Sequence, residues 1–229
     1  DDSLQNVDGL IVSCDQHPPS RLAIAACKSR GIPTFHILDG VVDWRTTFEN
    51  PKFDLKSGGV PLFQPLLSDC VFAMGELQKR QLQWLGNSNV HATGFPRFDQ
   101  LQRRPCRTGS VERETRLLIA TANTPWVTAE QQQVVTSQFQ GLLQGIDEYS
   151  PKLKPTWRIA SSLGKHLGVH VNADGTAAQA LNDADAVITT PSTFAVESIL
   201  KGVPTLIFDP FAYPILTPSA WNANHWESV

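Results

Sequence analysis

Residues 186–209 contain hydroxyl and carboxyl side chains spaced so that the hydroxyls could bind an anion and the carboxyl group could bind a hydroxyl of the same ligand. Ser192 and Thr193 come directly before a predicted helix, and Glu197 lies within its first turns. Backbone N–H groups at a helix N-terminus can bind a phosphate, and the helix dipole favours negative charge there. Two interpretations are open: an anion site in which Glu197 faces a ligand hydroxyl, or two helix caps with Glu197 as a surface acid that complements the dipole.

A strand–helix–strand unit is predicted to position these side chains. The β-branched run at 186–190 is typical of a strand buried on both faces, and Pro191 ends it. The following helix ends near Gly202, with Pro204 just beyond, and residues 205–208 predict the next strand. The apolar stripe expected to face the core consists of Val196, Ile199, Leu200 and Val203.

A second strand–helix–strand unit is predicted at residues 68–93, and it runs into the sequence GFPRFD at 94–99. The stretch before this unit, residues 43–67, is polar, contains Pro and Gly, and includes Trp44 and Phe48. Such a composition predicts a long functional or interface loop rather than a core element.

Both units resemble GT-B-type glycosyltransferases and their relatives, which include UDP-GlcNAc 2-epimerases, capsule polysaccharide transferases, and the CDP-glycerol and polysialic acid transferase groups. The pattern PST-x3-E-x4-G-x-P at 191–204 resembles the donor-binding turn and helix of their C-terminal domain. The run GFPRFD resembles a G-x-P-R-x-D run that leaves the N-terminal domain. The resemblance covers roughly two thirds of the chain. It implies an α/β fold with two Rossmann-like parallel-sheet domains that face a cleft.

The resemblance also implies a set of donor-binding residues in the C-terminal domain. In these families the turn and helix hold the nucleotide-sugar donor, which assigns phosphates to Ser192 and Thr193 and a ribose or sugar hydroxyl to Glu197. The first loop of the domain touches donor phosphates in look-alike transferases, which nominates Thr121 and Asn123. The alternative for that loop is an ordinary polar turn.

The basic contact of the C-terminal domain departs from the family pattern. The usual His-Pro after a strand is replaced by a run that contains Arg158. Arg158 would supply positive charge to a diphosphate, or it is a surface residue at a strand edge.

Candidate acceptor-side residues follow the strands of the N-terminal half. Bacterial sialyl- and polysialyltransferases carry an acidic-acidic-Gly motif in which an Asp deprotonates the acceptor hydroxyl, and the run LDG at 38–40 keeps the second acid. Transfer to a hydroxyl needs a general base, so Asp39 is nominated for that role. The alternative is that Asp39 is an ordinary turn residue ahead of a glycine. Asp15 and His17, after the first strand, and Arg97 are nominated as acceptor-side contacts.

Strands and helices alternate on both sides of a charged stretch at 103–115, which predicts two doubly wound parallel sheets. We expect an N-terminal, acceptor-side domain at 1–104 and a C-terminal, donor domain at 105–229. The first predicted strand of this chain corresponds to a later strand in the related families. The chain also ends soon after the donor-binding unit. The resemblance therefore implies a truncated or reduced member with both domains incomplete.

The amino-acid composition limits the classes of binding partner and cofactor that we expect for the protein. The 229 residues carry a net charge of −3 and no basic stripe, which argues against a nucleic-acid polymer. The sequence shows no signal peptide and no apolar run long enough to span a bilayer. Four scattered cysteines are typical of a reduced, cytoplasmic protein. The histidines lack metal-ligand spacing and His36 is expected in the core, so neither a metal nor a cofactor is expected.

We therefore expect a metal-independent glycosyltransferase with a nucleotide sugar as its substrate. It would move a sugar or polyol phosphate from a nucleotide-activated donor to a hydroxyl of a glycan or lipid-linked acceptor, in surface polysaccharide or glycan biosynthesis. One alternative is a UDP-GlcNAc 2-epimerase-like or nucleotide-sugar hydrolase activity. Another is a catalytically silent GT-B-like binding domain. A peripheral membrane association and the oligomeric state are left open.

Overall fold

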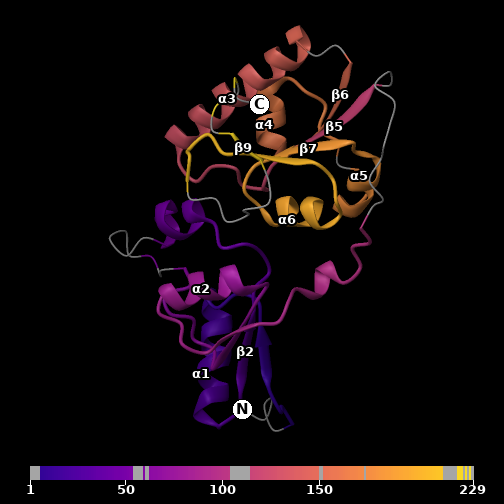
Figure 1. The fold of residues 1–229 in the computed structure, drawn as a ribbon. Helices are drawn as coiled ribbons and strands as arrows, with labels where there is room; N and C mark the ends of the chain where they lie inside the picture. The colour runs from indigo at the N-terminus through magenta and orange to yellow at the C-terminus, as the bar shows by residue number, and fades with distance from the viewer. Residues whose placement is uncertain are drawn as a thin grey trace. The chain divides into compact units, whose positions relative to one another are not determined.

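The computed structural model describes residues 6–53, 59, 62–103, 114–149, 152–172, 174–213, 221–223, 225 and 227. The chain divides into two compact units, Asp1–Asp99 and Gln100–Val229 (Figure 1). The boundary predicted between residues 104 and 105 falls within 104–113, outside the described residues. Each unit is built around a parallel sheet with helices, so the α/β class is confirmed.

The N-terminal unit contains a four-stranded parallel sheet in the order β1-β2-β3-β4. Two crossover helices connect the strands, and α1 starts with two prolines, which suit the first turn of a helix. Gly31, with φ +72, follows the end of α1. The strands and helices are β1 (Leu10–Val12), α1 (Pro18–Ser29), β2 (Thr34–Ile37), β3 (Cys70–Ala73), α2 (Glu76–Trp84) and β4 (Val90–Ala92). The core consists of Leu38, Val42, Leu66, Val71, Ala73, Leu82 and Val90.

The predicted loop at 43–67 contains two short helical turns, the π-helical η2 (Arg45–Glu49) and the 3-10 turn η3 (Pro51–Phe53). Asp43 organises the start of η2: its Oδ1 accepts the Thr46 N–H at 2.9 Å, and its carbonyl accepts the Thr47 hydroxyl at 2.7 Å. Short polar side chains commonly nucleate local turns in this way. Residues 54–58, 60 and 61 lie outside the described part of the chain. A further 3-10 turn, η5 (Pro96–Phe98), lies in the GFPRFD run.

The C-terminal unit contains a five-stranded parallel sheet in the order β6-β5-β7-β8-β9. Its strands and helices are β5 (Thr115–Ala120), α3 (Ala129–Tyr149), β6 (Leu153–Arg158), α4 (Ser161–Leu167), α5 (Ala177–Asp183), β7 (Ala186–Thr189), α6 (Thr193–Leu200), β8 (Thr205–Phe208) and β9 (Trp221–Ala223). Core clusters cover both faces of the sheet, as parallel sheets require. The edge strand β9 was not predicted.

The expected core face of α6 was correct only in part: Val203 is buried in the core, as predicted, but Leu200 is not. Leu200 is 46% exposed, whereas Ala195 and Ser198 are fully buried. The Ser198 hydroxyl donates to the Ala195 carbonyl at 2.9 Å and accepts from the Thr205 hydroxyl of β8 at 2.9 Å. Small side chains on this face allow the helix to lie close to the sheet, so size, not hydropathy alone, decided which side of α6 is buried. Among the described helices, none is long and apolar enough to cross a membrane.

Candidate functional site

Three loops meet at the carboxyl edge of the C-terminal sheet. The parallel register pairs Ala120 of β5 with Arg158 of β6 and with Thr189 of β7, so the three strands end side by side. Thr121 Oγ1 accepts the Ala160 N–H at 2.9 Å, which links the loops after β5 and β6. Open parallel α/β sheets bind ligands at this edge.

Thr190, which was not predicted as a site residue, completes the link. Its Oγ1 accepts the Ala122 N–H at 2.9 Å and so joins the loop after β7 to the loop after β5. The signal that could have identified it is a hydroxyl directly after a buried strand. The Thr121 hydroxyl therefore joins the first loop of the unit to the loop after β6, and the Thr190 hydroxyl joins it to the turn before α6. Asn123, in the same first loop, is exposed.

The N-terminus of α6 carries a polar atom that the helix itself does not use. Ser192 is at the N-cap position with extended backbone (φ −169, ψ 166), but its side chain makes no capping hydrogen bond. Its Oγ is buried and has no hydrogen-bond partner among the described residues. Thr193 is the first residue of the helix. Because the first N–H groups of a helix lack intrahelical acceptors, this turn presents donors and a hydroxyl at one place.

Glu197 is on the second turn of α6 and is only 3% exposed. The alternative that it is a surface acid is therefore wrong. A buried carboxylate is costly unless it is hydrogen-bonded or paired. Glu197 is the fifth residue of α6, about one turn after Ser192 and Thr193.

Arg158 is at the end of β6, and both terminal nitrogens of its guanidinium are used. Nη1 donates to the Asp174 carbonyl at 3.1 Å and Nη2 to the Gly175 carbonyl at 3.0 Å. These bonds hold the segment that leads into α5. The assignment of Arg158 to a diphosphate stays a prediction.

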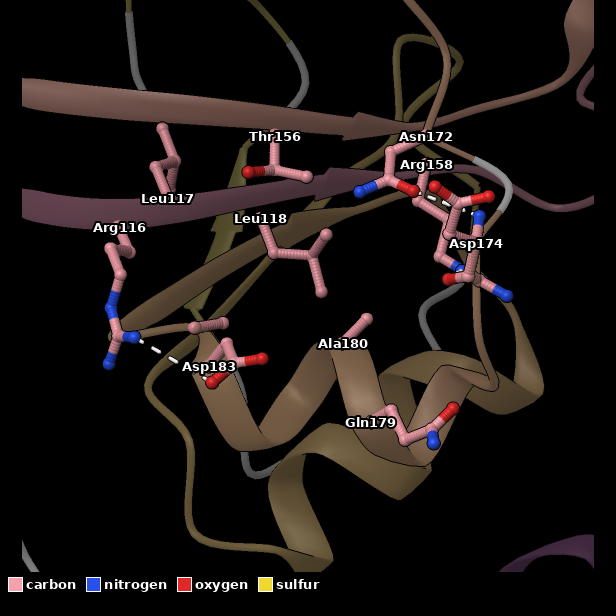
Figure 2. Close-up of a pocket in the computed structure, with 11 residues that line it drawn as sticks. Arg116, Leu117, Leu118, Thr156, Arg158, Asn172, Asp174, Gln179, Ala180 and Asp183 are labelled. Atoms are coloured by element: carbon pink, nitrogen blue, oxygen red, sulfur yellow. Dashed lines mark hydrogen bonds and ion pairs between the residues drawn. The ribbon is translucent and has the colours of Figure 1, made fainter.

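A pocket of about 260 Å³ lies between α5 and the strands β5 and β6. Figure 2 shows Arg158, Asn172 and Asp174 at one end and Arg116 with Asp183 at the other. Arg116 pairs with Asp183 at 3.7 Å, and with Asp185 at 3.4 Å. The pocket follows the face of the sheet, and it reaches the carboxyl edge only at its Arg158 end.

In the N-terminal unit, Asp15 and Asp39 follow neighbouring strands. The register pairs Val12 of β1 with His36 of β2, so the two segments leave the sheet at the same edge. Asp15 is 3% exposed, and its Oδ2 accepts the Leu67 N–H at 2.7 Å. Asp39 is exposed, and its role as general base stays a prediction.

The other two acceptor-side candidates are exposed side chains. His17 is at the N-cap position of α1, where its side chain makes no capping hydrogen bond, and Arg97 lies in η5. Across the described residues, no three His, Cys, Asp or Glu side chains are grouped to hold a metal ion. The metal-independent reaction stays a prediction.

His36 lies in the core, as predicted, at 1% exposure, and neither ring nitrogen has a hydrogen-bond partner within the described part of the chain. Burial lowers the pKa of His36, and the carboxylates of Asp15 and Asp39 oppose that shift. The folded protein therefore holds the ring neutral at a pH where the unfolded chain would protonate it.

This difference predicts an acid-sensitive stability. Because the pKa of His36 is lower in the folded state, the free energy of unfolding should fall as the pH drops below the ordinary value of 6.5. Urea unfolding at about pH 7.5 and about pH 5.5 should show a smaller pH dependence for His36→Leu than for the wild type. The exposed His170 provides the control, His170→Leu. An unchanged pH dependence in His36→Leu would contradict the assignment. The Thr34 hydroxyl lowers the pKa of Asp69 from its ordinary value of 3.8. The contribution of Asp69 to the free energy of unfolding therefore changes in more acidic solution than this comparison uses.

No family model matches the sequence, and no curated protein matches it. Solved structures that share its fold include the following two. One is a putative UDP-N-acetylglucosamine 2-epimerase from Listeria monocytogenes, with a TM-score of 0.57 and 14% identity over 91% of this chain and 59% of that one. The other is MnaA from S. aureus, solved with UDP, with a TM-score of 0.58 and 15% identity over 90% of this chain and 58% of that one. This chain thus spans less than two thirds of either protein. The predicted GT-B-like fold is confirmed.

Proposed function

We propose that the carboxyl edge of the C-terminal sheet binds a nucleotide-activated sugar or polyol and that the protein transfers its sugar or polyol phosphate to an acceptor hydroxyl. The observation that carries this proposal is the buried, unpartnered Oγ of Ser192 at the N-terminus of α6. A helix N-terminus with an unused hydroxyl fits a phosphate group. A protein of the same fold, MnaA, was solved with UDP, which supports a nucleotide as the ligand.

In this proposal the C-terminal unit stabilises the leaving nucleotide. The donor phosphates lie against Ser192, Thr193 and the loop that contains Thr121 and Asn123, and Glu197 accepts hydrogen bonds from a ribose or sugar hydroxyl. Negative charge that develops on the leaving phosphate is met by preorganised N–H groups and hydroxyls, which need no reorganisation during the reaction. Arg158 contributes by holding residues 174–175, because its guanidinium already donates to both carbonyls.

The N-terminal unit supplies the acceptor side. Asp39 takes the proton of the acceptor hydroxyl, and the acceptor oxygen forms the new bond to the sugar carbon or to phosphorus. The bond to the leaving nucleotide breaks, and the nucleotide departs with its electron pair. Asp15, His17 and Arg97 are proposed to contact the acceptor, a glycan or a lipid-linked molecule.

Nucleotide binding tests the donor site directly. The midpoint of thermal unfolding should rise saturably with one of UDP, CDP, CMP, GDP or their sugars, because a ligand that binds only the folded state stabilises it. Glu197→Gln should weaken that binding by about 10- to 100-fold, the usual worth of a hydrogen bond to a charged group. Ser192→Ala should weaken it by about 2- to 10-fold.

The matched control for these two variants is Ser137→Ala. Ser137 is an exposed serine of α3 whose hydroxyl bonds to the Val134 carbonyl. Wild-type affinity in Glu197→Gln, or binding by none of the nucleotides, would contradict the donor site. Donor turnover that needs no acceptor would favour the 2-epimerase-like or hydrolase reaction over transfer.

A further inference from the structure

Three aromatic side chains form an exposed cluster on the N-terminal unit. Trp44 and Phe48, from the start and the middle of the η2 region, have ring centroids 4.4 Å apart, and Phe48 lies 6.0 Å from Trp84 at the end of α2. Trp84 is 71% exposed, and the other two rings are 37% exposed. We call Trp44, Phe48 and Trp84 the aromatic cluster. Exposed groups of large apolar side chains mark interaction surfaces.

The exposed face of α2 extends the aromatic cluster. Leu77, Arg80 and Trp84 are spaced by three and four residues, which places them on one stripe of the helix. All three are exposed, whereas Gln78 and Leu82 form the buried side. The stripe therefore alternates apolar side chains with a cation.

Positive charge flanks the same surface. Arg80 on α2 and Lys52 on η3 are exposed, and neither forms an ion pair with a described residue. The acid of α2, Glu76, already pairs with Lys79 at 3.6 Å. One half-buried acid, Glu49, lies on η2. Two exposed cations beside an apolar cluster form a surface that is complementary to anionic groups next to an apolar medium.

We propose that the aromatic cluster and the α2 stripe dock onto the surface of a lipid bilayer that contains anionic headgroups. Trp side chains favour the level of the headgroups, and a helix with an apolar face and cations binds in the interface. Arg80 and Lys52 would meet the anionic headgroups. The ring planes of Trp44 and Phe48 are 47° apart and those of Phe48 and Trp84 are 70° apart, so the aromatic cluster presents an irregular apolar surface rather than a flat one. The docking surface is independent of the donor site.

Co-sedimentation with vesicles tests the proposal on the whole chain, without any nucleotide. Binding is expected to phosphatidylcholine vesicles that contain phosphatidylglycerol, and it should weaken as salt is added. Trp84→Ser should lower the partition coefficient on the order of tenfold, because it removes a large apolar side chain from the interface. Arg80→Gln should lower it about fivefold on anionic vesicles and leave it unchanged on neutral ones.

Trp221→Ser is the matched control, because Trp221 is 69% exposed but belongs to the C-terminal unit. It should bind vesicles as the wild type does. A circular dichroism melt of each variant checks folding, and Trp84→Phe should restore most of the binding. Absence of binding to anionic vesicles, or an equal loss in Trp221→Ser, would overturn the proposal. Self-association without vesicle binding, abolished by Trp84→Ser, would assign the surface to a second copy of the chain and would overturn it too.

Discussion

Asp39→Asn is expected to lower the rate of transfer by about 10²- to 10⁴-fold, the usual contribution of a general base. Asparagine keeps the shape of the side chain but cannot accept the proton of the acceptor hydroxyl. Asp39 is in the N-terminal unit and the proposed donor contacts are in the C-terminal unit. Nucleotide affinity should therefore stay within about twofold of the wild type, since the variant removes a group that acts on the acceptor.

The measurement is release of the nucleotide from the donor that the binding panel identifies, in the presence of glycan and lipid-linked acceptors. Asp8→Asn is the matched control, because Asp8 is an exposed acid of the same unit. A wild-type rate in Asp39→Asn would remove Asp39 from the mechanism. A loss of both rate and nucleotide affinity would show that the carboxylate binds the donor instead.

Phe139→Ala should lower the free energy of unfolding by about 3–5 kcal/mol, the largest stability effect that we expect. Phe139 is fully buried on α3, and its ring lies 5.3 Å from that of Phe208 on β8. The substitution removes apolar contact and leaves a cavity that the surrounding sheet cannot fill. Urea denaturation of the whole chain measures the change.

Val134→Ala is the control for this prediction, because Val134 is on the same helix but 39% exposed. It should change the free energy of unfolding by about 0.5 kcal/mol or less. The loss in Phe139→Ala should appear in the unfolding of the C-terminal unit. A change below about 1 kcal/mol would show that α3 does not pack on the sheet as the structure has it.

The periodic part of the fold was predictable from the sequence. The β-branched run at 186–190 became β7, and the strand–helix–strand unit predicted at 68–93 became β3, α2 and β4. Proline and glycine are local signals of the same kind: two prolines start α1, and Gly31 follows its end. These features depend on neighbours within a few residues, which sequence reading captures well.

Contacts between distant segments were harder to predict. The edge strand β9 pairs with β8 but has no strong pattern of its own, so only the neighbouring strand defines it. The buried side of α6 depended on how closely the helix approaches β8, and Ser198 and Thr205 made that approach through a shared hydrogen bond. Exposure of Trp84 likewise depends on which elements cover α2, which its own sequence does not specify.

By itself, the sequence determined the two parallel α/β sheets and the order of the polar turns at their carboxyl ends, because both depend on local pattern and on the direction of the strands. Only the tertiary structure decided which polar groups lie together. The Thr121 and Thr190 hydroxyls join loops whose sequence positions are far apart, through bonds to Ala160 and Ala122. Tertiary packing also buried Glu197 and left the Ser192 hydroxyl without a capping role. Parallel pairing brings distant strand ends to one edge, and no local signal in the chain specifies their register.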